Sequence, residues 1–232
     1  MVQVNNNTPI VLRVKFKKLG RLQYISHLDL VRTMMKIIVR AGLPLKYTEG
    51  FNPKPKLTFA APLSIGVESL AEFMDIRLTE KMDTGEALSR LNANMTDEMQ
   101  ALEAYYPENK LTDLKWLGYD ISICSTRLSE EHAKAAEELF ASDSLPVLKK
   151  TKSGEAVVDI KPLIHSASVA YSDFGLAVRC ILSADSSSFL NPEYVVKLLR
   201  ERCGILTSPD LLSEHYSILR TDAYRADMSE FK

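Results

Sequence analysis

The residues best suited to chemistry lie near the start of the chain, in the stretch from Tyr24 to Leu30. Ser26 is a typical helix N-cap and Asp29 completes a capping box three residues later, so His27 is expected on the first helical residue. The positive end of the helix dipole favours a neutral imidazole there, and a neutral histidine can act as a general base. His27 is therefore the candidate catalytic residue. The alternative is a first-turn side chain that only caps or packs.

Free N–H groups at a helix start can also hold a phosphate, with Arg21 and Lys54 as candidate neighbours. The charge distribution supports an anionic partner, because residues 1–60 hold eleven Lys or Arg and two Asp or Glu. Residues 61–115 hold five and eleven, and residues 116–232 hold thirteen and seventeen. This asymmetry predicts a surface that attracts an anion through forces that salt weakens. The alternative is that the acidic stretch balances the basic one in the folded chain.

A strand and a helix position these groups. Residues 12–17 alternate apolar and basic side chains, which is the pattern of a half-buried strand. Residues 26–41 are predicted to form a helix whose apolar residues make a core stripe. Arg32, Lys36 and Arg40 recur every four residues on another face. One face of this helix is therefore expected to pack, and the other to be basic.

The loop that follows, residues 48–56, is expected to be stiff. Two X-Pro steps favour extended backbone at Asn52 and Lys54. Phe51 either stacks on a base or packs into the core, and packing is the favoured interpretation. Glu49 is expected to pair with a nearby Lys or Arg, and the alternatives are contact with a partner or a role as an acid.

The succession of elements predicts an α+β protein. The first half follows the order β-α-β-β-α-β, and a similar rhythm of strands and helices restarts after a polar stretch at residues 107–115. We therefore predict two tandem ferredoxin-like (βαββαβ) domains with antiparallel sheets, at residues 1–107 and 116–232. The strands predicted for the second domain are residues 119–126, 157–160, 168–171, 175–182 and 215–221, and its helices are residues 129–141 and 192–203.

Several classes of function are disfavoured by what the sequence lacks. Cys124, Cys180 and Cys203 are too widely spaced for a zinc motif and too few for a disulfide framework. A Gly-rich phosphate loop, a paired Cys-x-x-Cys and a Gly-x-Ser-x-Gly elbow are all missing. We therefore predict no metal site and no cofactor. The sequence also lacks a signal peptide and an apolar run of about eighteen residues, so we predict a cytoplasmic protein without membrane contact.

Five motifs carry a family resemblance. They are Val14-Lys15-Phe16, Leu22-Gln23-Tyr24-Ile25-Ser26-His27-Leu28-Asp29-Leu30, Arg40-Ala41-Gly42-Leu43-Pro44, Tyr47-Thr48-Glu49-Gly50-Phe51-Asn52-Pro53-Lys54-Pro55 and Pro62-Leu63-Ser64-Ile65-Gly66-Val67-Glu68-Ser69. With them the chain resembles the radical-SAM-associated domain of unknown function, in its stand-alone form. The resemblance covers nearly the whole chain and implies a radical SAM protein, encoded nearby, that holds the iron–sulfur cluster. Lys54 departs from the family pattern, in which histidine is common, and this argues against a metal site in the loop.

The leading hypothesis is a non-catalytic RNA-binding or substrate-presenting accessory subunit of a radical SAM enzyme that modifies an RNA such as tRNA or rRNA. Its candidate binding residues are Arg13, Lys15, Arg21, Tyr24, Arg32, Lys36, Tyr47, Glu49, Phe51, Asn52 and Lys54. One alternative is a metal-independent endoribonuclease, in which His27 takes a proton from a ribose hydroxyl and Lys54 or Arg21 stabilises the developing charge. A loose likeness of fold to the CRISPR repeat-processing endoribonucleases is compatible with it. The other alternative is a protein-interaction module whose basic surface docks the radical SAM partner.

Overall fold

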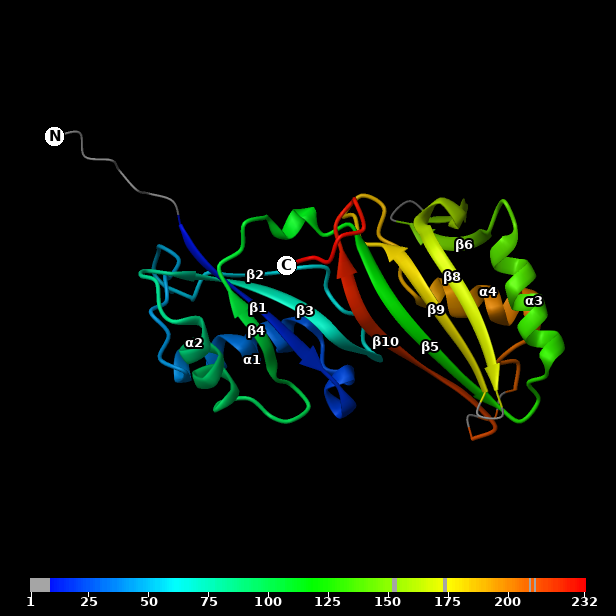
Figure 1. Ribbon diagram of the computed structural model, residues 1–232, viewed down its shortest axis with the longest axis horizontal. Helices are drawn as coiled ribbons and strands as arrows, with labels where there is room; N and C mark the ends of the chain where they lie inside the picture. The colour runs from blue at the N-terminus through cyan, green and yellow to red at the C-terminus, as the bar shows by residue number, and fades with distance from the viewer. Residues whose placement is uncertain (1–8, 152–153, 173–174, 209, 211) are drawn as a thin grey trace. The chain divides into compact units, whose positions relative to one another are not determined.

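The computed structural model describes residues 9–151, 154–172, 175–208, 210 and 212–232, and its elements are labelled in Figure 1. The chain divides into two compact units, and the boundary between them falls after Thr112. Lys232 belongs with the first unit. Both units combine helices with antiparallel strands, so the predicted α+β class is confirmed. In the described part of the chain, no helix is long and apolar enough to cross a membrane.

The first unit has the element order β-α-β-β-α-β, with a short 3-10 helix η1 before the first α-helix. Its strands pair antiparallel in the order β4-β1-β3-β2. The bounds are β1 Ile10–Lys18, η1 Gly20–Tyr24, α1 His27–Arg40, β2 Leu57–Phe59, β3 Val67–Leu78, α2 Thr84–Asn92 and β4 Ala101–Tyr105.

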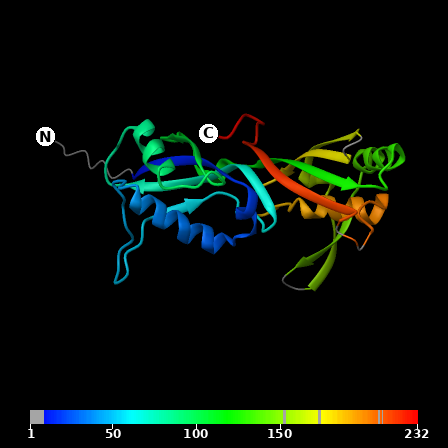
Figure 2. The ribbon, with the colours of Figure 1, turned by 90° about the horizontal axis from the view of Figure 1, so that it is seen from below.

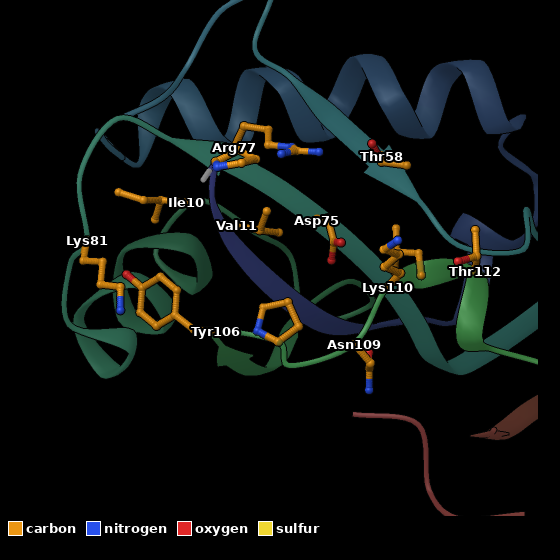
Figure 3. A pocket seen from close by; sticks show the side chains of 13 residues that line it. Ile10, Val11, Thr58, Asp75, Arg77, Lys81, Tyr106, Asn109, Lys110 and Thr112 are labelled. Atoms are coloured by element: carbon orange, nitrogen blue, oxygen red, sulfur yellow. The ribbon is translucent and has the colours of Figure 1, made fainter. Parts of the chain in front are cut away.

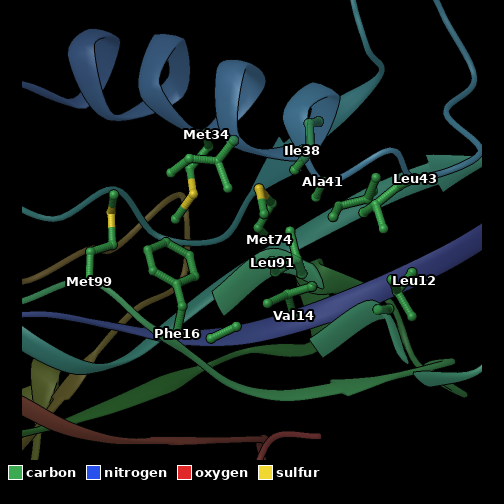
Figure 4. Close-up of a cluster of buried hydrophobic side chains, with 14 of the residues drawn as sticks. Leu12, Val14, Phe16, Met34, Ile38, Ala41, Leu43, Met74, Leu91 and Met99 are labelled. Carbon is green, nitrogen blue, oxygen red and sulfur yellow. The ribbon is translucent and has the colours of Figure 1, made fainter. Parts of the chain in front are cut away.

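The core of this unit lies between the sheet and its two helices (Figure 4). Alternate residues of β1 and β3 point toward the helices, as the two-residue period of a strand requires. They pack against α1 and α2, and burial of each such side chain contributes about 1.5–3 kcal/mol. Arg13, Lys15, Asp75 and Arg77 occupy the alternate positions and so lie on the opposite face of the sheet. The buried cluster includes Leu12, Val14, Phe16, Leu30, Met34, Ile37, Ile38, Met74, Ile76 and Leu91.

Helix α1 begins with the predicted capping box. The Ser26 hydroxyl accepts a hydrogen bond from the Asp29 N–H at 3.2 Å and donates one to the Asp29 carboxylate at 2.7 Å. At the other end, Gly42 follows the C-cap with a φ of +65°, which glycine adopts without strain. The helix predicted from the sequence is therefore confirmed, with both ends set by local chemistry.

Residues 46–56 form a narrow two-stranded extension after α1, which we call the finger (Figure 2). Its two sides are joined by hydrogen bonds from the Thr48 N–H to the Lys54 carbonyl at 2.8 Å and from the Lys56 N–H to the Lys46 carbonyl at 2.9 Å. The Thr48 hydroxyl also accepts a hydrogen bond from the Lys54 N–H at 3.0 Å. Gly50 turns the chain near the tip with a φ of +119°. These bonds and the two prolines give the finger the defined shape that the sequence predicts.

The second unit contains one strand more than the sequence predicts, β6, which forms a hairpin with β7. Its main sheet has the antiparallel order β10-β5-β9-β8, and β6 pairs only with β7 in the described part of the chain. The second-half prediction omitted β6 and was wrong there. Val147 is buried and Leu148 is 45% exposed, but both are apolar, so the sequence of this strand shows no alternation. The bounds are β5 Trp116–Ser125, α3 Glu130–Ala141, β6 Pro146–Thr151, β7 Gly154–Asp159, β8 Ile164–Ser172, β9 Gly175–Ser183, α4 Glu193–Cys203 and β10 Glu214–Tyr224.

Candidate functional site

His27 occupies the first residue of α1, as predicted, and its contacts are those of a packed side chain. The imidazole is half-buried and meets the Phe59 ring edge-on, with 5.6 Å between ring centroids. Its Nδ1 atom is buried and forms no hydrogen bond to any residue that the structure describes. A general base is usually oriented by a hydrogen-bond partner. The surroundings of His27 therefore fit the packing alternative better than the catalytic one.

The structure does not bring Lys54 to His27. Lys54 lies in the finger, which follows the C-terminal end of α1, whereas His27 lies at the N-terminal end. The 14 residues of this helix span roughly 20 Å at 1.5 Å per residue. Arg21, in η1, lies near the helix start, but its side chain is 93% exposed and its Nε is 3.6 Å from a Glu98 carboxylate oxygen. The expectation that Lys54 lies near His27 was therefore wrong, because the length of α1 separates the two residues.

Arg13 is unavailable to a ligand because it is fully buried. Its guanidinium donates two hydrogen bonds to Asp75, at 2.7 and 3.1 Å, and another to the backbone carbonyl of Asn109 at 3.1 Å. The neighbouring Tyr105 is also largely buried, and that burial raises the pKa of its hydroxyl to about 12. Arg13 is a structural residue of the sheet, and its assignment to a binding surface is corrected.

Two more predicted binding cations form ion pairs. Lys15 lies 3.7 Å from Glu103, and Arg32 lies 3.1 Å from Asp29 on the surface of α1. Of the acids that pair with the basic first sixty residues, Asp75, Glu98 and Glu103 all come from the acidic stretch at 61–115. The alternative expected from the charge count is therefore realised in part. The predicted cations also fail to share one face, since Arg13 and Lys15 lie on the sheet face opposite α1.

Six other cations, which we call the basic end, form no ion pair with any described residue. They come from the second half of α1, the finger and the end of β3, and three of them are joined through their backbones. The Lys46 N–H donates to the Arg77 carbonyl, and the Arg77 N–H donates to the Lys56 carbonyl, at 2.9 and 3.0 Å. The basic end consists of Lys36, Arg40, Lys46, Lys54, Lys56 and Arg77.

The finger presents its aromatic residues to solvent. Phe51 at the tip is fully exposed, and Tyr47 is 42% exposed. The prediction that Phe51 packs into the core was wrong, because the finger extends beyond the elements against which the ring would pack. Glu49 and Asn52 are exposed beside it, and Glu49 forms no ion pair with a described residue. Tyr24, also exposed, lies at the far end of α1 and does not join this group.

Two adjoining hollows lie beside the basic end, on the sheet face opposite the helices. The larger has a volume of about 710 Å³, and the smaller has a volume of about 530 Å³. They share Pro9, Thr58 and Arg77 as lining residues, and the smaller is also lined by Lys46 and Lys56. Sequence reasoning missed these three cations as a group. Residues 72–78 alternate in the sequence as a strand does, which puts Arg77 on one strand face, but nothing in the sequence shows that Lys46 and Lys56 lie across from it.

The cysteines offer little chemistry. Burial raises the pKa of the Cys180 thiol to about 12 and also raises the pKa of Cys203, so both stay protonated near neutral pH. Cys124 is exposed on β5. Within the described ranges, no group of three or more His, Cys, Asp or Glu residues is placed to hold a metal ion.

Comparisons with known proteins identify a family but no activity. The family described as "Uncharacterized protein conserved in bacteria (DUF2344)" matches residues 11–192. A comparison with curated proteins gave no match.

Three solved structures are similar in part, at low identity. One chain of "Crystal Structure of a Cbf5-Nop10-Gar1 Complex" shares 9% identity at a TM-score of 0.49, and the match covers 91% of this chain and 48% of that one. This chain therefore spans about half the length of that protein. An unknown protein from Galdieria sulphuraria shares 12% identity at a TM-score of 0.26, over 91% and 98% of the two chains. A putative glycine cleavage system transcriptional repressor shares 10% at a TM-score of 0.23, over 94% and 99%. At these scores the likenesses carry no inference about function.

Proposed function

Since the chain belongs to this uncharacterized bacterial family, we propose a function for it from the surface it presents: an RNA-binding or substrate-presenting accessory subunit of a radical SAM enzyme. The resemblance of its motifs to the radical-SAM-associated domain supports the proposal that its partner is a radical SAM enzyme. The positive charge of the basic end, which pairs with no described acid, supports the binding of an anionic polymer. The proposed place of action is the cytoplasm.

The strand orders support a ferredoxin-like interpretation of both units. In each, the first and third strands of a β-α-β-β-α-β series lie at the centre of the sheet and the fourth and second lie outside them, as β4-β1-β3-β2 and β10-β5-β9-β8. Strands β6 and β7 then form an insertion in the second unit. This architecture hosts many functions, so the functional proposal depends on the finger and not on the fold.

The observation that carries the proposal is the full exposure of Phe51 at the tip of the finger, whose three lysines pair with no described acid. Lysines bind the phosphates of an RNA strand, while an exposed aromatic ring stacks on an unpaired base. A phenylalanine held in solvent gains nothing from the fold itself, because its apolar surface stays in water. Lys36 and Arg40 on α1 extend the positive surface from the base of the finger.

The partner is proposed to hold the iron–sulfur cluster. Such a cluster needs several cysteine thiolates placed close together. Cys124, Cys180 and Cys203 lie on β5, β9 and α4. In this proposal the partner carries out the chemical reaction, and this chain binds and presents the RNA.

The test is a filter-binding titration of total tRNA at several salt concentrations. We expect the affinity of the wild-type protein to fall steeply with salt, and the variant K46Q/K54Q/K56Q to bind about tenfold or more weakly with a shallower salt dependence, because each lost phosphate contact reduces the slope by about 0.7–0.9. The control is K134Q/R202Q, which removes from α3 and α4 two exposed cations that pair with no described acid.

Two outcomes would overturn the proposal. If wild-type protein shows no affinity for tRNA at low salt, RNA binding is excluded, and capture of the radical SAM protein by the finger lysines would then favour a protein-docking module. If the control variant loses as much affinity as the finger variant, the binding is a property of net charge and not of the finger. Incubation of labelled RNA with wild-type and His27→Ala protein addresses the nuclease alternative, and we expect no cleavage by either.

A further inference from the structure

The larger hollow of the first unit has the construction of a small-molecule site. Its volume of about 710 Å³ falls in the range of roughly 300–1,000 Å³ that is usual for such sites. Strands β1, β2 and β3 form its floor, and the segment 106–112 forms a wall (Figure 3). All of its lining residues belong to the first unit.

One part of this hollow is apolar and contains a fixed aromatic ring. The Tyr106 hydroxyl accepts a hydrogen bond from the Met82 N–H at 2.8 Å and donates one to the Met82 carbonyl at 2.9 Å. The orientation of the ring is therefore set before any ligand arrives. Val11 and Leu111 supply aliphatic surface in the hollow, and Ile10 and Tyr106, which also line it, pack against the core of the unit as well. A flat apolar group of moderate size would be buried here without rearrangement of the side chains.

The other part is cationic. Arg77 forms no ion pair with a described residue, and in Figure 3 it lies with Thr58 on the side of the hollow away from Tyr106. The smaller hollow continues from Arg77 and adds Lys46 and Lys56. Among the described residues that line the two hollows, Asp75 is the one acid, and its carboxylate is bound by the buried Arg13.

These charges select an anion. Because Arg13 neutralises Asp75, the lining of the two hollows is cationic: Arg77, Lys46 and Lys56 form a cluster at one end, and Lys81 and Lys110 line the rest. The Lys81 ammonium lies 5.2 Å from the centroid of the Tyr106 ring. An arginine flanked by two lysines is a typical phosphate site, since the guanidinium donates two parallel hydrogen bonds and the ammonium groups add point charges.

We propose that the paired hollows bind one nucleotide, with its phosphate at Arg77, Lys46 and Lys56 and its base in the apolar part beside Tyr106. The shared chemistry is a phosphate joined to a flat ring, and it comes either from a free mononucleotide or from the 5′-terminal nucleotide of an RNA. The site differs from the tip of the finger, so a nucleotide can be bound here whether or not Phe51 contacts RNA.

Isothermal titration of the full chain with AMP, adenosine and inorganic phosphate tests the proposal. We expect AMP to bind more tightly than either fragment, because it alone fills both parts of the site. Arg77→Met keeps the aliphatic stem of this half-buried residue and should weaken AMP binding by about tenfold or more. The control is Arg202→Met on α4, which removes an exposed arginine from the second unit and should leave the affinity unchanged within about twofold.

A pair of short RNAs, one with a 5′-phosphate and one with a 5′-hydroxyl, separates the two sources. If the protein binds the 5′-phosphorylated RNA more tightly and Arg77→Met abolishes this difference, the site binds an RNA end. If the protein binds AMP but does not distinguish the two RNAs, the site binds a free nucleotide. Absence of AMP binding together with absence of 5′-phosphate preference would overturn the proposal, as would equal affinity for AMP and inorganic phosphate. Circular dichroism checks that Arg77→Met folds; if it does not, the exposed Lys46→Met, which removes another proposed phosphate contact, replaces it with the same expected loss of AMP affinity. Because AMP is measured alone, this result is independent of tRNA binding by the finger.

Discussion

The two ends of α1 are both rich in polar and charged side chains, but they differ in what those side chains contact. At the N-terminal end, Asp29 accepts hydrogen bonds from Ser26 and Arg32, and Arg21 lies beside Glu98. At the C-terminal end, the cations of α1 and the finger have no acidic partner among the described residues. The first end is satisfied by its own neighbours, so only the second has charge available for a ligand.

This difference shows that a basic sequence segment is not by itself a binding surface. A cation that already pairs with a carboxylate offers a partner little, because the new contact must replace an existing one and dehydrate both groups. Arg13 is the extreme case, since it is fully buried and bound to Asp75. We therefore expect paired cations to affect stability and unpaired cations to affect binding.

The largest effect is expected from removal of the partner of Arg13. Asp75→Ala leaves a buried guanidinium without its carboxylate, and the free energy of unfolding should fall by about 3–5 kcal/mol. Urea denaturation followed by circular dichroism measures it. The matched change is Glu98→Ala, which removes the carboxylate beside the exposed Arg21 and should alter stability by no more than about 0.5 kcal/mol. Similar losses in the two variants would contradict the distinction between buried and exposed pairs.

A smaller effect, on binding alone, is expected at the tip of the finger. Phe51→Ala removes a ring that has no packing role, so stability should change by no more than about 0.5 kcal/mol. Loss of base stacking should weaken tRNA binding by about 1–3 kcal/mol. Filter binding measures this, and the control is Leu212→Ala, which truncates an equally exposed apolar residue, 93% exposed, in the second unit. A clear loss of stability in Phe51→Ala would show that the ring packs after all.

The parts of the fold that the sequence predicted are those set by neighbouring residues or by regular burial. Ser26 and Asp29 are three residues apart, so the capping box could be recognised without knowledge of the fold. The alternation of residues 12–17 reflects burial on one side of β1. In β6 the buried Val147 is followed by Leu148, which is apolar although it is 45% exposed, so no alternation marks this strand in the sequence and it was missed.

The candidate site was harder to predict because its residues meet through long-range pairing. Arg77 reaches Lys56 across 21 positions of sequence, through a backbone hydrogen bond of 3.0 Å. Ion pairing depends on strand register in the same way. Arg13 lies opposite Asp75 because of the register in which β1 pairs with β3. Phe51 was assigned to the core because it is hydrophobic. Hydrophobicity alone does not show whether a helix or strand lies beside the loop and can pack against the ring. Sequence reasoning thus located the finger but misjudged which of its neighbours are free.

The smallest effect is expected at the N-terminal end of α1, where Ser26→Ala removes the side-chain cap. The loss of the hydrogen bond from the Asp29 N–H should lower the free energy of unfolding by about 1 kcal/mol.

The Ser26 hydroxyl is also the main cause that lowers the pKa of Asp29 below its ordinary 3.8. A carboxyl with a lowered pKa in the folded state stabilises the protein above the ordinary value and loses that contribution as the pH falls through the folded value. The difference between wild type and Ser26→Ala should therefore be greatest near neutral pH and shrink below about pH 4, as urea titrations across this range would show. tRNA affinity should not change, because the two ends of the helix act separately. If the folded Ser26→Ala variant lost tRNA binding, the N-terminal end of α1 would belong to the binding surface, and the proposed difference between the two ends of the helix would be wrong.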